Sequence, residues 1–117
     1  MSIIDNEDLQ SLRDSIIEGM LDYMSDADVT FTKEDVDECR RILEEHLDAL
    51  SKVQDRDSAM VCVKTTVLRL NALNEKAGGE LIEADQREGI CEYIIKAGAL
   101  LDFNGEDEDV TEEWREW

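Results

Sequence analysis

Apolar residues recur at intervals of three and four along four stretches of this sequence, and no proline interrupts them. This spacing gathers apolar side chains on one face of an α-helix, because a helix turns once every 3.6 residues. The stretches cover about residues 6–25, 33–54, 58–77 and 84–101. We therefore predict an all-α fold, in which residues 1–101 form an antiparallel bundle of four main helices.

Short polar side chains stand where three of these helices should begin. Asp5 or Asn6 precedes the first helix. Thr32 precedes the second and Ser58 the third. Side chains of this kind accept hydrogen bonds from the free amides of a first helical turn, so they predict the starting points.

The third predicted helix differs from the others in two ways. Residues 60–67 are rich in β-branched side chains, which makes a strand the alternative there, although the helical spacing continues to Ala77. Residues 58–79 also carry one acid and three bases in a chain that is otherwise acidic. We expect this apolar, slightly basic segment to be the central and least exposed helix.

The last segment, residues 102–117, carries eight acids and one base and contains both tryptophans of the protein. Val110, Trp114 and Trp117 are spaced so that they would share one face of a helix. We predict a short amphipathic C-terminal helix that docks on the bundle. The alternative is an exposed acidic and aromatic binding segment, because tryptophan is enriched among the anchors of protein interfaces.

The strongest compositional signal is charge. The chain has 31 acidic and 12 basic residues, which gives a formal net charge of −19. A net charge of about 2–8 in magnitude is enough to keep a small domain soluble. Such a field repels nucleic acids and anionic membranes and attracts basic proteins. No apolar run suits a membrane span, and the first residues do not resemble a signal peptide, so we expect a cytoplasmic protein.

Residues suited to catalysis or metal binding are few. Cys39, Cys62 and Cys91 are odd in number and widely spaced, which favours reduced, mostly buried thiols over disulfides or a zinc site. The single histidine, His46, could share a helix face with Cys39, but two ligands do not make a zinc centre. We expect a partly exposed histidine, no catalytic site and no cofactor.

One acidic stretch partly matches the ligand pattern of the calcium-binding EF-hand loop. Residues 26–37 place acidic or hydroxyl side chains at the positions that such a loop uses for ligands. However, Phe31 occupies the position that needs glycine, and Asp37 replaces the longer bidentate glutamate. A loop capped by Thr32 explains the same residues, so we expect no calcium site.

These features predict a binding protein rather than an enzyme. Small acidic single-domain chains in bacteria often serve as immunity proteins that block nuclease toxins, and this chain resembles them in size and charge. It lacks the tyrosine-rich motif of the nuclease-colicin immunity family. The resemblance implies that carboxylates would occupy positions in a basic partner that are meant for phosphates.

The expected contact residues are carboxylates of the first two helices and the C-terminal segment, together with both tryptophans. They are Asp22, Asp26, Asp28, Glu44, Glu45, Asp48, Glu106, Asp107, Glu108, Asp109, Trp114 and Trp117. Two other functions remain open at this point. One is a structural or regulatory module that self-associates through an apolar helix face, and the other is a protein that mimics DNA.

Overall fold

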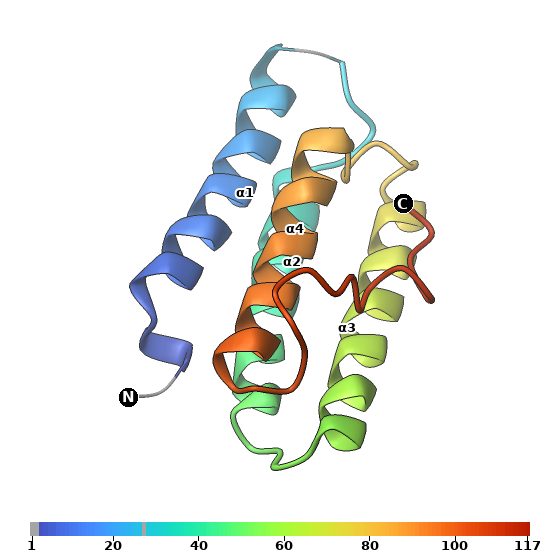
Figure 1. Cartoon of the computed structure of the whole chain (residues 1–117). Helices are drawn as coiled ribbons and strands as arrows, with labels where there is room; N and C mark the ends of the chain where they lie inside the picture. The colour runs from blue at the N-terminus through green and yellow to red at the C-terminus, as the bar shows by residue number, and fades with distance from the viewer. Residues whose placement is uncertain (1–2, 27) are drawn as a thin grey trace.

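In the computed structural model, residues 3–26 and 28–117 are described. They form a short 3-10 helix and four α-helices: η1 (Ile3–Asp5), α1 (Glu7–Asp26), α2 (Lys33–Leu50), α3 (Arg56–Lys76) and α4 (Ala84–Leu100). Successive α-helices run in opposite directions (Figure 1). The described residues contain no strand, so the all-α prediction is confirmed and residues 60–67 are helical.

Side chains just before three helices satisfy the amides of their first turns. The Asn6 carboxamide accepts from the amide of Leu9 at 3.0 Å, which agrees with the prediction for α1. Thr32 caps α2 as predicted, and a capping box forms because Asp35 in turn accepts from the amide of Thr32 at 3.0 Å. These short-range bonds fix where the helices begin.

Two predicted helix boundaries are wrong. The second helix ends at Leu50 rather than residue 54, although Val53 continues the apolar spacing. The third begins at Arg56, because Asp55 rather than Ser58 is its cap and accepts from the Ser58 amide at 2.7 Å. The spacing of apolar residues does not detect the turn and the short irregular segment, residues 51–55, that separate the two helices.

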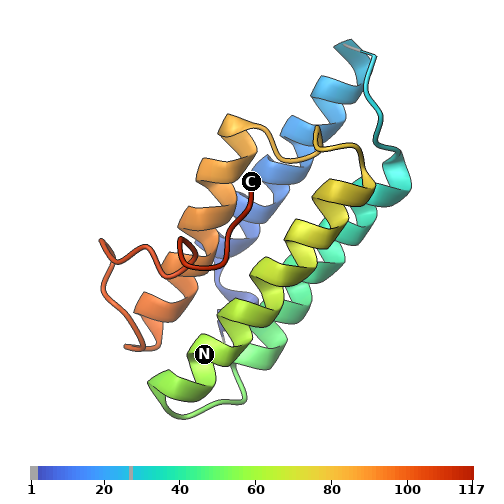
Figure 2. The ribbon, with the colours of Figure 1, turned by 90° about the vertical axis from the view of Figure 1, so that its right-hand side faces the viewer.

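The helices do not all pack against one another. α1 packs against α4 and α2, and α2 packs against α3, whereas α3 and α4 make little direct contact. Residues 102–117, here called the C-terminal strap, loop out beside the end of α4 and then cross to α3, where Asn71 binds Trp114 and Glu116 (Figures 1 and 2). The expectation that the third helix is central is therefore wrong, and its outward Val61 and Leu68 are 64% and 44% exposed.

The C-terminal strap is not the predicted short helix. Residues 110–114 form turns, and residues 115–117 are neither helical nor in a turn. Val110 is nevertheless buried, and Trp114 and Trp117 are half-buried against the hydrophobic core. The strap's apolar side chains thus reach the core without helical spacing, because an irregular backbone crosses from α4 to α3.

Tyr93 links the two sides of the bundle. Its ring is fully buried, and its hydroxyl donates a hydrogen bond to the carbonyl of Leu43 at 3.0 Å, which joins α4 to α2. Burial raises the pKa of the Tyr93 hydroxyl, so this donor keeps its proton. A buried hydroxyl with a backbone partner fixes the relative position of two helices that are far apart in sequence.

Glycine at position 89 allows α1 and α4 to approach each other. A Cβ added at Gly89 would lie 2.8 Å from Cγ1 of Ile16, which is itself buried. A methyl group at this position would therefore push the two helices apart.

We expect Gly89→Ala to lower the free energy of unfolding by about 1–3 kcal/mol, even though alanine favours helix more than glycine does. Urea denaturation would measure the loss. The control is Gly105→Ala, because nothing lies within 4 Å of the Cβ that it adds. Equal effects of the two substitutions would contradict the close packing of α1 on α4.

His46 is fully buried, in contrast to the predicted partly exposed histidine. It is 1% exposed, and its Nδ1 lies 2.7 Å from the hydroxyl oxygen of Thr66 on α3. Burial lowers the pKa of His46 from 6.5 to about 4, because the charged ring would lose its hydration. The residue therefore serves as a neutral polar contact between α2 and α3.

This burial predicts a loss of stability in acid. The unfolded chain takes up the His46 proton at a higher pH than the folded chain does. The stabilisation that neutral His46 gives the fold above pH 6.5 is therefore lost as the pH falls towards 4. We expect the titration of His46 to lower the free energy of unfolding by about 2–3 kcal/mol as the pH falls from 7.5 to 4.5. The measurement compares urea unfolding of the wild type with that of a His46→Leu, Thr66→Val double variant, in which the carboxylates titrate as before. A double variant with the same acid sensitivity as the wild type would contradict the assignment.

Candidate protein-binding surface

A shallow groove of about 610 Å³ lies between α4 and the C-terminal strap. Cys91 and Ile95 contribute its less polar part, and both are only partly exposed. The charged residues that line it are Glu88, Glu92, Lys96, Glu106 and Asp107. Such a groove suits a lysine or arginine side chain, whose aliphatic part packs on apolar atoms while its charged end meets carboxylates.

Two further depressions extend this groove along α4. The first lies between α4 and α1 and shares Glu88 and Glu92 with the groove. The second shares Asp85 with the first and reaches the end of α1. Together they define what we call the α1–α4 acidic surface, formed by Asp22, Asp26, Glu83, Asp85, Glu88, Glu92, Glu106 and Asp107.

Four of these carboxylates were among the predicted contact residues. Asp22 and Asp26 come from the last turns of α1, and Glu106 and Asp107 come from the strap. Segments about 80 residues apart in sequence thus contribute to one surface because α1 and α4 are packed side by side. Asp28 is exposed in the loop after α1 and lines none of the three depressions.

The carboxylates of α4 were missed from the sequence. Asp85, Glu88 and Glu92 follow one another at intervals of three and four, so the helix presents them on a single face. This spacing could have revealed them. The net charge of the segment is modest, and net charge does not show how acids are distributed around a helix.

Three other predicted residues, all on α2, lie outside the α1–α4 acidic surface and are engaged in ion pairs. The pairs are Glu44 with Arg13 at 3.2 Å, Glu45 with Arg69 at 3.1 Å, and Asp48 with Lys52 at 3.1 Å. The last pair has the i,i+4 spacing that stabilises helices. These carboxylates are already partly neutralised within the chain.

Glu108 and Asp109 hold the strap in place. Arg56 donates hydrogen bonds to the Glu108 carboxylate and, with the amide of Gly105, lowers the pKa of Glu108 to about 2. Partial burial opposes ionisation of Asp109, but hydrogen bonds from Thr111 outweigh it, so the pKa of Asp109 is also lowered. Both carboxylates therefore stay ionised and have partners within the strap and α3.

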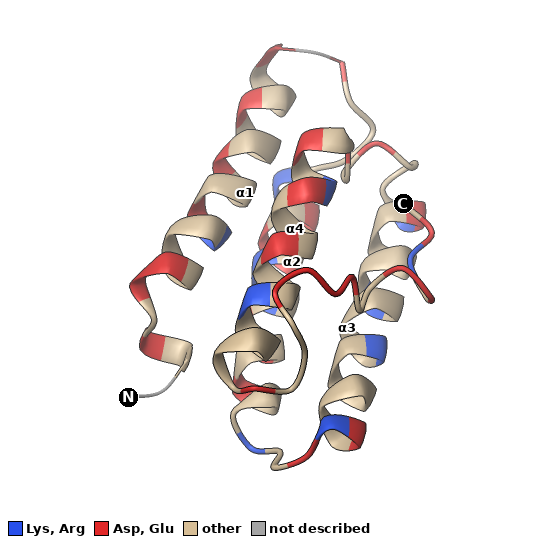
Figure 3. Cartoon of the chain, in the orientation of Figure 1, with Lys and Arg blue, Asp and Glu red and all other residues tan. Residues whose placement is uncertain are grey.

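Basic residues are unevenly distributed over the molecule. Figure 3 shows acidic residues along α1, the upper part of α4 and the strap, whereas α3 carries several basic residues. Of the described residues that line the three depressions, one is basic, and this residue, Lys96, lies 3.3 Å from the Asp8 carboxylate. The α1–α4 acidic surface is consequently short of compensating positive charge.

The two tryptophans do not project freely from the strap. Both are half-buried against the core, and the guanidinium of Arg115 lies 5.7 Å from the ring centre of Trp117. Both rings therefore lie against the bundle. Whether either ring also contacts a partner stays a prediction.

Two residues of the EF-hand-like frame, Thr30 and Thr32, have other partners. The Thr30 amide donates to the Glu80 carboxylate at 2.9 Å, and the Thr30 hydroxyl donates to the carbonyl of Ala77. Thr32 caps α2. Residue 27 lies outside the described residues. Among the residues that are described, no group of three or more His, Cys, Asp or Glu side chains could hold a metal ion.

Comparisons with protein-family models, with curated proteins and with solved structures found no match for this chain. Within residues 3–26 and 28–117, no helix combines the length and the apolar character that a membrane span requires.

The ion pairs of the strap predict a difference between neighbouring carboxylates. We expect Glu108→Gln to lower the melting temperature by a few degrees, because it removes the negative charge that pairs with Arg56 and replaces one of the two oxygens that accept from the guanidinium by an NH₂ group. Glu106→Gln makes the same change of charge at an exposed groove residue. It should leave the melting temperature unchanged or slightly raised. Thermal melts of both variants in one buffer make the comparison, and equal losses would refute the distinction.

Proposed function

We propose that this protein binds a basic protein through the α1–α4 acidic surface and inhibits it, as an immunity-type inhibitor of a nuclease-like bacterial toxin would. The observation that supports this proposal is the continuity of eight carboxylates across three elements, with Lys96 paired to Asp8. A nuclease cleft is lined by positive charge because it binds phosphates. Carboxylates spaced along a rigid helix face can occupy the same positions.

In the proposed mechanism, charge sets the rate of association and apolar contacts set the rate of dissociation. The negative field speeds the approach of a cationic partner, to as much as about 10⁸ M⁻¹s⁻¹ at low salt. Cys91 and Ile95 in the groove give the aliphatic part of a lysine or arginine an apolar contact, which lengthens the life of the complex. Inhibition then results from covering the partner's phosphate-binding cleft.

Two variants of equal net charge test which surface binds. Glu88→Gln with Glu92→Gln removes two charges from the α1–α4 acidic surface, whereas Glu44→Gln with Glu45→Gln removes two from α2. With the basic protein recovered from the native host, stopped-flow mixing at 50 mM salt should show association slowed about three- to tenfold by the first pair. The second pair should change it little, because ion pairs already offset those charges.

Salt provides an independent measurement. Association of the wild type should slow steeply between 50 and 500 mM salt, as the Debye length falls from about 14 to about 4 Å, while dissociation changes less. A recovered partner that is acidic or neutral, or association that does not depend on salt, would refute the proposal. A partner set consisting of several unrelated DNA-binding proteins would indicate DNA mimicry instead.

Self-association is the second candidate function, and one observation favours it. Val61 and Leu68 are exposed two turns apart on the outer side of α3, the helix with net positive charge. Copies that meet through α3 would keep their acidic surfaces apart. Sedimentation at increasing concentration, with Leu68→Glu as the comparison, distinguishes this function, since only a self-associating wild type would gain mass.

A further inference from the structure

His46 of α2 and Thr66 of α3 form a buried polar contact that suits only the neutral form of the histidine. We propose that this contact makes the boundary between α2 and α3 an acid-sensitive switch: when His46 takes up a proton, α3 opens away from α2 while α1 and α4 stay packed together. This behaviour differs from a general loss of stability in acid, because one helix opens before the rest of the fold. It uses none of the carboxylates of the α1–α4 acidic surface.

The hydrogen bonds of His46 explain why the charged ring does not fit. Its Nδ1 lies 2.7 Å from the Thr66 hydroxyl oxygen, and its Nε2 is buried without a hydrogen-bond partner among the described residues. A neutral ring suits this geometry in either tautomer, because the hydroxyl can donate to Nδ1 or accept from it. A protonated ring carries an N–H group on both nitrogens, and only one of them would have an acceptor. The other N–H group and the positive charge would be buried without compensation, which is costly.

Among the described residues, no charged group accepts a hydrogen bond from His46. Two other titratable groups of the interior stay neutral, because burial raises the pKa of Cys39 to about 12 and also raises the pKa of Tyr93. The charged groups on α2 and on the elements that pack against it are paired with one another or exposed. They are Arg69 with Glu38 and Glu45, Lys76 with Asp35, Arg13 with Glu44, Lys52 with Asp48, Lys64 of α3 and Asp5 of η1. Burial therefore disfavours the charged ring with nothing to oppose it.

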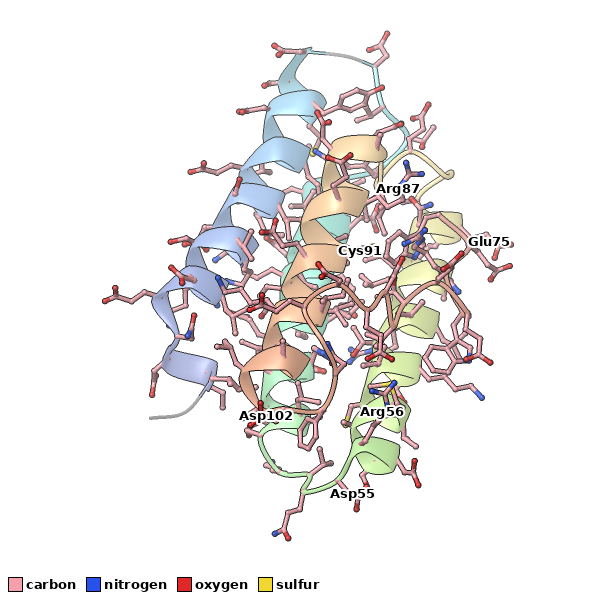
Figure 4. The ribbon with its side chains drawn as sticks, viewed as in Figure 1. Asp55, Arg56, Glu75, Arg87, Cys91 and Asp102 are labelled. Atoms are coloured by element: carbon pink, nitrogen blue, oxygen red, sulfur yellow. The ribbon has the colours of Figure 1, made fainter. Side chains whose placement is uncertain are left out.

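α3 is the helix best placed to open. It packs closely on α2 alone among the helices, whereas α1 packs on both α2 and α4. Short connections, residues 51–55 and 77–83, flank it. Figure 4 shows α3 along one side of the molecule, with Arg56 at its beginning and Glu75 near its end. Opening at the boundary with α2 can thus leave the packing of α1 on α4 in place, as in other proteins that open one cooperative unit at a time.

The C-terminal strap is the second attachment of α3, and the protonation of His46 does not affect it. Asn71 binds the carbonyl of Trp114 and the amide of Glu116, and none of these groups titrates. Arg56 pairs with Glu108, whose pKa is lowered to about 2 by that pairing and by the Gly105 amide. Both attachments therefore persist at a pH at which His46 becomes charged. Acid weakens the side of α3 that faces α2, and the strap stays bound to α3.

Native-state hydrogen exchange of the wild type at pH 4.5 tests whether α3 opens by itself. The slowest amides of α3 should show an opening constant at least tenfold larger than that of the slowest amides of α4. Low concentrations of urea should affect the opening of α3 less than that of α4, because the opening of one helix exposes less surface than global unfolding does. Equal opening constants with equal urea dependence would mean that the bundle unfolds as one unit, and the proposal would fail.

A double variant, His46→Leu with Thr66→Val, tests whether His46 is the group that responds to acid. Both proteins keep the ion pairs between α2 and α3, so the difference between them is due to the buried contact. After correction for the intrinsic exchange rates, lowering the pH from 7.5 to 4.5 should raise the opening constant of α3 about 30- to 100-fold more in the wild type than in the double variant. An equal rise in both proteins would overturn the assignment to His46.

Asn71→Ala is the matched control, because it weakens the attachment of α3 to the strap and leaves the contact with α2 intact. It should raise the opening constant of α3 by the same factor at both pH values, since the carboxamide does not titrate. A factor that grows in acid would show that the strap takes part in the response and would contradict the proposal. The comparison of α3 with α4 in the wild type decides the outcome even if a variant does not fold.

Discussion

The structure depends on how the gap between α3 and α4 is covered. α1, α2 and their neighbours pack directly, but α3 and α4 make little contact with each other, and without another element the apolar sides that they turn towards the gap would meet water. The C-terminal strap crosses from α4 to α3 and packs Val110, Trp114 and Trp117 against the core. It also brings backbone groups that need partners, and Asn71 of α3 provides them. The bundle is thus completed by a segment with no helix of its own.

The same strap connects the fold to the charge distribution. Its Glu108 and Asp109 pair with Arg56 and Arg115, whereas Glu106 and Asp107 line the groove on α4. Acidic residues that are adjacent in sequence, within residues 106–109, therefore differ in whether they form ion pairs. Carboxylates with a basic partner stabilise the fold, and those without a compensating base contribute to the surface for which we propose a basic protein partner.

Charge segregation also explains why a chain with a net charge of −19 can remain compact. Bases on α2 and α3 pair with acids of their own or neighbouring helices, as Arg69 does with Glu38 and Glu45. The unbalanced acids gather on α1, α4 and the strap, where hydration and screening reduce their repulsion. Neutral His46 and the Tyr93 hydroxyl provide the polar contacts in the interior without adding charge.

The sequence by itself determined the local features of this protein. Helical spacing and short polar caps identified four helices, placed the starts of α1 and α2, and favoured helix over strand at residues 60–67, because these properties depend on residues within a few positions of each other. Tertiary structure decided the rest. The burial of His46, the position of α3 at an edge and the irregular strap depend on contacts between residues 20–50 positions apart. The division of the acids into paired and unpaired groups has the same origin, since the bases that neutralise them come from other helices.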